Sequence, residues 1–503
     1  MIMLRYVYRH TLMLWLLVFS HPFNLSYAQD SASSLSRDED DQSSTTTSTG
    51  AASSTESPVS ATSDGPTSMM SANATAPSPR LDVVNDMCYR WFHQSTIKKG
   101  SLWIDGGIES FADEISRWST SGPTVLGYNY RMIQIDLTQP FNWTEINITT
   151  LVLDKTEDPD SGNMPPQVSN AVLLSGLPED SRIWLYGGTT YWYNTSFPEF
   201  QGPTTQIYSL WSYDTDSQRW DQYDVSSMAP SRPSNGLAAE APTLGLGFYF
   251  NGELDSGSSA ETGWFRDYRK DFLEGMVVIN TTSQTAANVS TEMAVGNTPR
   301  TRGGAAYIPG IGGSGVLAIM GGTYKPRDVP DEWEISDSAS FASMDNITIF
   351  DVGAYLRNET EQLWYSQNAT GDIPGPRAYF CTVLVSTEDS LVHNIYVYAG
   401  RGPDNMIYDD VYVLSIPSFT WTKVFGPATS PRFGHTCHQV GDQMITVGGQ
   451  RYTDLGQQLP CDWETQGVAI FNLSSTQWGD VFKPVESTAP YTVPSQVRDT
   501  IKE

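Results

Sequence analysis

One short stretch of the chain places histidine and cysteine close enough together to suggest metal chemistry. His435, Cys437 and His438 fall within four residues of a segment that has the pattern of a β-strand. Successive side chains of a strand point to opposite faces, so residues 435 and 437 share one face and residue 438 takes the other. Ligands of a zinc ion must converge on one point. We therefore predict no metal site from this stretch, and no cofactor is indicated elsewhere.

Four cysteines are too few for a disulfide scaffold, so a buried core must supply most of the stability. Cys437 and Cys461 flank one predicted hairpin, and we predict a bridge between them. Cys88 and Cys381 lie in apolar strand contexts, where they form either a second bridge or two buried thiols. The acidic and aromatic cluster Asp462-Trp463-Glu464 follows Cys461. A pair of carboxylates could serve glycoside hydrolysis, but a loop held by the disulfide is the favoured interpretation.

Arginines recur at one place in a repeated pattern. Three of them follow a proline, and the first stands at the matching place without one: Arg90, Arg300, Arg377 and Arg432. If the repeats are equivalent, these side chains form a partial ring that could bind an anionic ligand or an acidic peptide. The alternative is that each arginine forms a salt bridge with a carboxylate between repeats.

The elements that must position these residues are short β-strands that end in glycine. An apolar run followed by one or two glycines occurs six times, at 102–107, 183–188, 248–252, 317–322, 396–400 and 445–449. Glycine readily adopts the positive φ of a tight turn. A second strand follows each copy, at 131–137, 210–214, 275–280, 347–351, 411–415 and 468–472. A tryptophan follows this strand in five copies: Trp143, Trp220, Trp364, Trp421 and Trp478.

This order of glycine pair, apolar strand and tryptophan resembles the kelch repeat, over about residues 88–485. The resemblance implies an all-β fold, a six-bladed β-propeller, because radial packing covers both faces of each four-stranded sheet. The first four repeats are longer than the typical period of about 50 residues. Their insertions fall mainly after the glycines, at 108–128, 189–206, 253–272 and 323–343. Insertions at one structural position mark one face of a repeat protein, often the binding face.

The kelch-like superfamily also contains copper radical oxidases that resemble galactose oxidase. Their copper requires two histidines and two tyrosines, and the family motif places a histidine directly after a tyrosine. No tyrosine of this chain is followed by histidine, and only His93, His393, His435 and His438 lie beyond the N-terminal segment. His93 and His435 occupy the strand position of the repeat, which is typical of packed structural histidines. The copper ligands are therefore missing, and we predict a protein without this activity.

The N-terminus and the sequons indicate export. Basic residues, the apolar run 12–19 and the small residues Ser26 and Ala28 are typical of a signal peptide, predicted at 1–28. Residues 29–84 are rich in serine and threonine and are predicted to form a disordered stalk. The propeller is predicted at 85–485 and a C-terminal tail at 486–503. Sequons that predict N-glycosylation occur at Asn73, Asn142, Asn147, Asn194, Asn280, Asn288, Asn346, Asn358, Asn368 and Asn472.

The net charge of −28 argues against nucleic acid and anionic membranes as partners, and no later segment is apolar enough to span a bilayer. The chain resembles secreted or wall-associated kelch proteins of filamentous fungi. That resemblance implies a non-catalytic extracellular or cell-wall binding module for a glycan or a protein. The alternative is an accessory protein or enzyme that acts on a small metabolite in a fungal secondary-metabolite pathway.

Overall fold

Six four-stranded antiparallel sheets form most of the part of the chain that the structure describes. The structure is a computed structural model, and it describes residues 82–501 apart from 112–124, 146–147, 191–209, 231, 256, 259–269, 297, 325–339, 360, 428–429 and 452–460. The predicted signal peptide and nearly all of the predicted stalk lie outside the described residues. Within the described part, strands predominate and helices are short.

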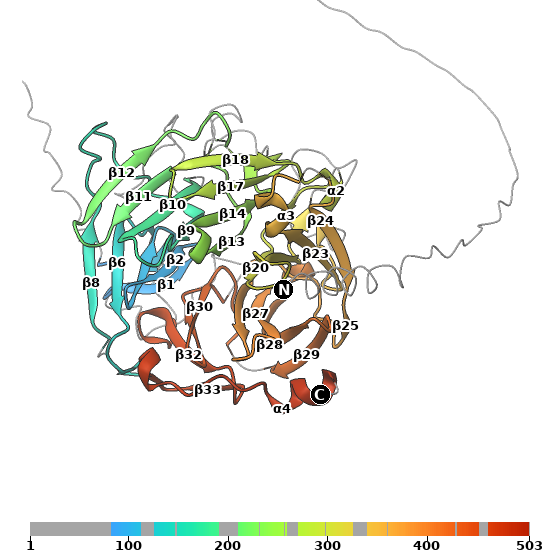
Figure 1. Cartoon of the computed structure of the whole chain (residues 1–503). Helices are drawn as coiled ribbons and strands as arrows, with labels where there is room; N and C mark the ends of the chain where they lie inside the picture. Colours follow the sequence, from blue (N-terminus) through green and yellow to red (C-terminus); the bar gives the residue numbers. More distant parts are fainter. Residues whose placement is uncertain are drawn as a thin grey trace, which may run out of the picture. The chain divides into compact units, whose positions relative to one another are not determined.

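Each sheet is a meander of four strands, and the six sheets follow one another around a common centre in chain order (Figure 1). Blade 1 contains β2 (Gln94–Lys98), β3 (Ser101–Asp105), β6 (Arg131–Asp136) and β8 (Thr150–Asp154). Blade 2 contains β9 (Ser169–Leu174), β10 (Arg182–Thr189), β11 (Leu210–Asp214) and β12 (Arg219–Tyr223). Blade 3 contains β13 (Leu237–Ala241), β14 (Leu246–Phe250), β17 (Met276–Asn280) and β18 (Thr285–Val289).

The second half of the molecule repeats this arrangement. Blade 4 contains β20 (Gly304–Ile308), β21 (Val316–Met320), β23 (Asn346–Asp351) and β24 (Trp364–Asn368). Blade 5 contains β26 (Cys381–Ser386), β27 (His393–Arg401), β28 (Ile407–Ile416) and β29 (Thr420–Phe425), with β25 (Thr370–Gly371) added at its edge. Blade 6 contains β30 (Thr436–Val440), β31 (Gln443–Val447), β32 (Val468–Asn472) and β33 (Gln477–Gly479). The predicted six-bladed propeller is confirmed.

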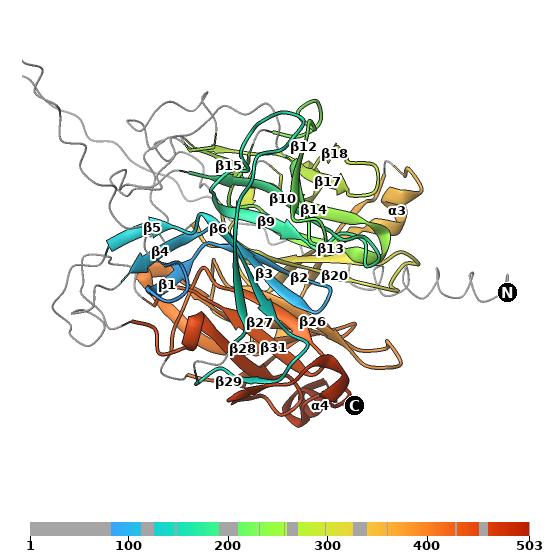
Figure 2. The same ribbon diagram turned by 90° about the vertical axis from the view of Figure 1, so that its left-hand side faces the viewer.

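Short ribbons and helices complete the described part. The ribbons are β1 (Met87–Trp91) with β4 (Ile108–Phe111) and β5 (Val125–Tyr128), β7 (Phe141–Asn142) with β34 (Val481–Phe482), β15 (Glu253–Leu254) with β16 (Asp271–Phe272), and β19 (Arg300–Thr301) with β22 (Thr323–Tyr324). The helices are α2 (Glu292–Val295), α3 (Val352–Leu356) and α4 (Ser495–Ile501), with the 3₁₀ turns η1 (Pro242–Leu244), η4 (Pro403–Asn405), η5 (Thr465–Gly467) and η6 (Val485–Ser487). Figure 2 shows β4 and β5 projecting from the blades beside β1.

The repeated glycines and tryptophans join neighbouring blades. The second glycine of each pair donates its amide hydrogen to a backbone carbonyl of the next blade's leading loop; Gly322 bonds Arg377 at 2.9 Å and Gly449 bonds Arg90 at 2.6 Å. A Cβ on Gly448 would lie 2.4 Å from the Arg90 carbonyl oxygen, so the close approach excludes any other residue there. Trp421 donates its indole hydrogen back to the Met344 carbonyl of blade 4 at 2.9 Å. The tryptophan therefore bridges the blades, as the kelch resemblance implies.

Both ends of the described chain are packed, which differs from the predicted boundaries. Val83 is buried in the core between blades 6 and 1, so packing begins before residue 85. The predicted tail is also part of the fold, because Val497 of α4 is buried among blades 5 and 6. Tyr491 extends this contact, with its hydroxyl 3.0 Å from that of Tyr396. Apolar residues of the segment predicted as a C-terminal tail therefore pack against the blades.

The disulfide pairing also corrects the sequence-based prediction. Cys88 is bonded to Cys461, and Cys381 is bonded to Cys437, so the predicted Cys437–Cys461 bridge is wrong. Cys437 lies on the innermost strand of blade 6, and this strand packs against the innermost strand of blade 5, which carries Cys381. Cys461 belongs to a loop of blade 6 that meets β1, because circular packing brings the first and last segments together. Proximity along the chain was therefore a poor guide to pairing.

Candidate functional site

A closed ring of backbone hydrogen bonds surrounds the centre of the propeller. One residue of each blade takes part, at the start of the innermost strand or two positions before it. Its amide hydrogen is donated to the carbonyl oxygen of the equivalent residue in the preceding blade, at N–O distances of 2.7–3.1 Å. All six have positive φ values, between 55° and 68°. The ring residues are Phe92, Asn170, Asn235, Arg302, Tyr379 and Gly434. Because the six bonds close on themselves, the five side chains among them are gathered around the axis.

The ring has an aromatic part and a polar part. Phe92 and Tyr379 lie with their ring centroids 4.7 Å apart, and Phe433 lies 5.9 Å from Phe92. Arg302 adjoins this aromatic group, donating from Nε to the Tyr379 hydroxyl at 2.6 Å. Asn235 belongs to the polar part. The axis therefore presents aromatic surface beside hydrogen-bonding groups.

A buried cluster, here called the axial cluster, lies on the polar part and consists of Asn235, Glu253, Lys270 and Arg302. Glu253 is fully buried, and its Oε1 accepts from Asn235 Nδ2 at 3.0 Å and lies 3.3 Å from Lys270 Nζ. Arg302 Nη2 donates to the same oxygen. The second carboxylate oxygen, Oε2, and the Asn235 Oδ1 have no hydrogen-bond partner within the described part of the chain. The cluster thus contains two buried acceptors whose hydrogen-bonding capacity the described residues do not use.

Opposing effects set the charge of Glu253. Burial acts to raise its pKa, but the cations of Arg302 and Lys270 outweigh that effect and hold the pKa below the usual value. Arg302 also stays charged, since Glu253 opposes the effect of burial and raises the guanidinium pKa. The neighbouring Asp255 behaves differently: burial raises its pKa, although Thr189 donates to it at 2.6 Å. The cluster therefore holds one ionised carboxylate between two cations.

The predicted arginine series lies close to this ring but turns into the blades. Arg90, Arg377 and Arg432 are buried, and each forms a salt bridge within its own blade. The partners are Glu109 at 2.5 Å for Arg90, Asp410 at 2.7 Å for Arg377, and Glu464 at 2.6 Å with Asp462 at 3.4 Å for Arg432. These three arginines therefore form salt bridges, as the alternative predicted, but each carboxylate belongs to the same repeat as its arginine and does not lie between repeats.

Arg300, the fourth predicted arginine, is not placed like the others. It is half-buried, its Nη1 has no hydrogen-bond partner among the described residues, and burial lowers its pKa. Arg302, two residues later, reaches the axis instead, and sequence reasoning missed it. The signal was present as a second arginine in Pro-Arg-Thr-Arg at 299–302. Arg302 reaches the axis through a positive φ of 62°, and the presence of a residue other than glycine does not predict such a value.

The acidic and aromatic cluster after Cys461 serves to anchor a loop. Asp462 and Glu464 both face Arg432, and Glu464 is buried with its pKa raised by burial to about 8. Trp463 is 58% exposed and lies 5.1 Å from Trp143 in an edge-to-face contact. With Cys461 bonded to Cys88, the arrangement matches the interpretation of a loop held by a disulfide.

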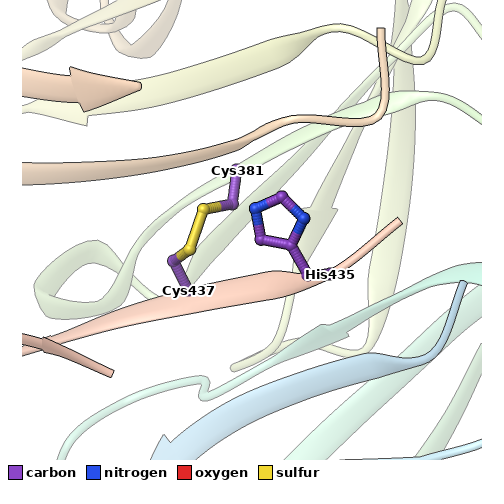
Figure 3. Close-up of side chains that lie close together, drawn as sticks. All are labelled: Cys381, His435 and Cys437. Atoms are coloured by element: carbon purple, nitrogen blue, oxygen red, sulfur yellow. A yellow bond between two sulfur atoms is a disulfide. The ribbon is translucent and has the colours of Figure 1, made fainter. Parts of the chain in front are cut away.

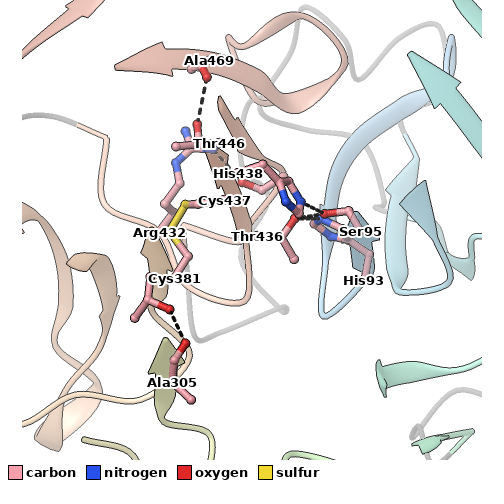
Figure 4. The surroundings of a disulfide bond; sticks show 12 residues. His93, Ser95, Ala305, Cys381, Arg432, Thr436, Cys437, His438, Thr446 and Ala469 are labelled. Carbon is pink, nitrogen blue, oxygen red and sulfur yellow. Dashed lines mark hydrogen bonds between the residues drawn. A yellow bond between two sulfur atoms is a disulfide. The ribbon is translucent and has the colours of Figure 1, made fainter. Parts of the chain in front are cut away.

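The two histidines of the segment 435–438 point to opposite faces of the strand, as strand geometry requires. His435 and Cys437 face blade 5, where His435 lies beside the Cys381–Cys437 bridge (Figure 3). His438 faces blade 1 and lies 2.6 Å from the Ser95 hydroxyl. His93 faces the same contact, 3.0 Å from the Thr436 hydroxyl (Figure 4). His393 lies in blade 5, with its Nδ1 2.7 Å from the Ser386 hydroxyl.

The predicted sequons are spread over the described surface. Asn288, Asn358 and Asn368 are exposed, whereas the other described ones are half-buried: Asn142, Asn280, Asn346 and Asn472. Asn472 uses Nδ2, the atom that would carry a glycan, to donate to Asp442 at 2.7 Å. Asn346 likewise donates from Nδ2, to the Ser366 hydroxyl at 2.8 Å, so these two sequons are less suited to modification than the exposed ones. Asn73, Asn147 and Asn194 lie outside the described residues.

Each predicted insertion connects the second and third strands of its blade. The short ribbons formed by the described ends of the insertions lie in the same connections. Glu253 of the axial cluster begins β15, which is the first described part of one such connection. Thr190 is the last described residue before the masked part of the blade 2 connection, and its amide donates to Gly257 of the blade 3 connection at 3.1 Å. The axial cluster therefore lies on the face that carries these connections.

Comparison with known proteins agrees with this topology. Residues 341–491 match the family model described as the KLHDC2/KLHL20/DRC7 Kelch-repeats domain. A kelch repeat-containing protein of Arthroderma benhamiae is 28% identical over 455 residues, which is 82% of this chain and 60% of that protein. A solved structure described as "Structure of YjhT" aligns with a TM-score of 0.47 and 11% identity over 79% of this chain and 99% of that one. No helix of the described part is long and apolar enough to cross a bilayer.

Proposed function

Starting from a kelch-type propeller, we propose that this protein is an extracellular binding module that holds its ligand at the axial cluster. Kelch propellers act in general as interaction modules. The observation that carries the proposal is the pair of buried, unpartnered acceptors, Glu253 Oε2 and Asn235 Oδ1, at the centre of the ring. An unsatisfied buried acceptor costs about 1–3 kcal/mol, so a ligand that donates hydrogen bonds to both gains affinity there.

The chemistry of the axis favours a polar ligand with an apolar side. Hydroxyl groups of a glycan, or amide groups of a protein loop, can donate to the two acceptors, and Phe92 and Tyr379 offer aromatic surface next to them. Binding sites that combine stacking surface with a few placed polar groups are typical for such ligands. The extracellular part of the proposal rests on the predicted signal peptide and sequons, and two disulfides are compatible with an oxidising compartment.

A second candidate is a small metabolite held at the same place, with the protein acting as an accessory factor or enzyme in a fungal secondary-metabolite pathway. The convergence of Arg302, Tyr379 and Glu253 favours this alternative, because it offers a cation, a phenol and a carboxylate within one cluster. A metabolite that lacks glycan character would use Arg302 rather than the open acceptors.

Glycan-array binding by the full chain, combined with metabolite profiling of a deletion strain, separates the two. The binding-module proposal expects at least one glycan class to bind and an Asn235→Gly variant to lose at least about fivefold in affinity. Glycine keeps the positive φ of position 235 while removing the acceptor. Asn170→Gly, at the same ring position of blade 2, is the matched control and should bind as the wild type does. Absent glycan binding together with a lost metabolite would overturn the proposal in favour of the second candidate.

A further inference from the structure

The contact between blades 5 and 6 contains three side chains that have the composition of a metal site. We propose that Cys381, His435 and Cys437 bind one thiophilic d¹⁰ ion, Cu⁺ or Zn²⁺, once the Cys381–Cys437 disulfide is reduced. Their sulfur and imidazole nitrogen atoms all lie within 4.8 Å of one another. In Figure 3 the imidazole ring faces the bridge, with the two sulfurs on one side of it.

The fold, and not the chain order, brings these three groups together. His435 and Cys437 are two residues apart on the leading edge of blade 6, so their side chains share a face. Cys381 begins β26, the innermost strand of blade 5, and meets them from the opposite side. His438 is directed to the other face and takes no part. Two adjoining strands thus supply three ligands without any rearrangement of the backbone.

His435 is the observation that points to a ligand. Its side chain is buried, with 5% of the residue exposed, and no side chain of the described part bonds Nδ1 or Nε2; the polar neighbour that acts on the ring is the Tyr398 backbone. Buried imidazoles usually bond through at least one nitrogen. Cys381 and Cys437 are 7% and 9% exposed, so the three groups share a dry environment. A lone pair on the ring is therefore free to meet an ion at the sulfurs.

The chemistry balances with a dithiol as the reductant. The dithiol gives two electrons and two protons to the S–S bond and becomes a disulfide itself, while Cys381 and Cys437 become thiols. The ion then displaces the two thiol protons to solvent and accepts a lone pair from neutral His435. Soft sulfur ligands select Cu⁺ or Zn²⁺ over harder ions.

Metal titration of the full chain tests the proposal. The protein is reduced without oxygen by a dithiol, freed of reductant, and titrated with Zn²⁺ or Cu⁺ against a chromophoric chelator. We expect one equivalent to bind to the reduced protein and none at this site to the oxidised protein. His435→Phe should weaken binding at least about tenfold. Cys381→Ala/Cys437→Ala, which keeps the Cys88–Cys461 bridge as the reducible pair, should show no such equivalent.

Folding of the reduced chain is followed by tryptophan fluorescence in the same samples. If the reduced wild type stays folded, less than one bound equivalent, or equal binding by His435→Phe, overturns the proposal. If it unfolds without metal, the proposal requires that one equivalent restores the native fluorescence in the wild type but not in His435→Phe. Failure to restore it is an equally clear contradiction. Co²⁺ gives a second readout, since thiolate-to-metal charge-transfer bands appear when a thiolate binds and grow in intensity with each further thiolate.

Discussion

Blade 6 contacts its two neighbours through equivalent positions that carry different chemistry. At the contact with blade 5, Cys381 and Cys437 form a disulfide. At the contact with blade 1, the corresponding residues are Thr436 and Ser95, whose hydroxyl oxygens lie 2.5 Å apart. In both contacts, the second residue after the ring residue of one blade meets the third residue after the ring residue of the next blade. The same backbone geometry therefore accepts either a covalent bond or a hydrogen bond.

A histidine accompanies both contacts. His435 stands beside the disulfide without a side-chain hydrogen-bond partner among the described residues, whereas its counterpart His93 bonds the Thr436 hydroxyl at 3.0 Å. The contact with blade 1 is the place where the first and last blades meet, and it has further ties outside the centre. β34 pairs with β7, and Cys88 is bonded to Cys461. Closure of the propeller thus combines a polar inner contact with a covalent bond on the loop face.

The two contacts should differ most in the free energy of unfolding that is lost when their arginines are replaced. Arg432 at the blade 5 contact holds two carboxylates, and Arg90 at the blade 1 contact holds one. Removing one partner of a buried ion pair costs about 3–5 kcal/mol because a charge is left without compensation. We expect Arg432→Met to lie at the upper end of this range and Arg90→Met at the lower end. Denaturant unfolding followed by tryptophan fluorescence checks the order, and equal losses would contradict it.

Removing the disulfides one at a time compares the contacts directly. Cys88–Cys461 spans 373 residues and Cys381–Cys437 spans 56. In the chain-entropy model the longer loop restricts the unfolded chain more, by about 1–2 kcal/mol. Cys88→Ala/Cys461→Ala should therefore lower the free energy of unfolding by that much more than Cys381→Ala/Cys437→Ala. Urea unfolding of the two double variants measures the difference, and a reversed order would show that strain or packing dominates.

The parts of the fold that repeat locally were predictable from the sequence. The glycine-terminated runs at 183–188 and 445–449 correspond to strands β10 and β31, as predicted, because an apolar run and a positive-φ stop are encoded within a few residues. Trp421 was correctly predicted as the tryptophan of its repeat for the same reason. The disulfide partners of Cys88 and Cys437 were not predictable, since they depend on which strands meet across blades.

The candidate site was predicted only in part. The face that carries the insertions could be inferred, because their position in the repeat is visible in the spacing. The axial cluster could not, because Glu253 and Arg302 are 49 residues apart and come from different blades. Asn235 reaches them through a positive φ of 58° that its residue type permits but does not demand. Contacts between residues that only the closure of the ring brings together cannot be inferred from the spacing in a single sequence.

The hydroxyl pair at the blade 1 contact should be less costly to lose than a disulfide. Thr436→Val keeps the shape of the side chain but removes the partner of both His93 and Ser95. An unpaired buried polar group costs about 1–3 kcal/mol, and Ser95 retains His438 as a partner, so we expect a loss of about 2 kcal/mol. Ser95→Ala is the matched variant, since it leaves Thr436 bonded to His93 but removes the partner of His438, and its loss should be similar. Thermal unfolding at neutral pH measures both losses, and a loss near zero for either variant would contradict the prediction.

Acidification should separate the two contacts by the smallest margin. Burial lowers the pKa of His438 to about 4 and that of His435 to about 3, with Arg432 acting in the same direction on His435. His93, which faces Arg90, His435 and His438, also has a pKa well below its usual value because of burial. The folded protein keeps these rings neutral while the unfolded chain binds protons below about pH 6.5. Stability is thus present above that pH and is lost as the pH falls toward the folded pKa of each ring.

Between pH 6.5 and 5.5 each ring should cost about 1 kcal/mol of unfolding free energy. His438→Gln removes one of these contributions at the blade 1 contact, and His435→Gln removes one at the blade 5 contact, so both variants should lose less stability than the wild type over this range. The two diverge only below about pH 4, where His438 begins to take up its proton in the folded state and His435 does not. Unfolding midpoints of the three proteins from pH 7 to pH 3.5 measure this. If His438→Gln leaves the slope unchanged, His438 takes up its proton over the same pH range in the folded and the unfolded chain, and burial does not lower its pKa.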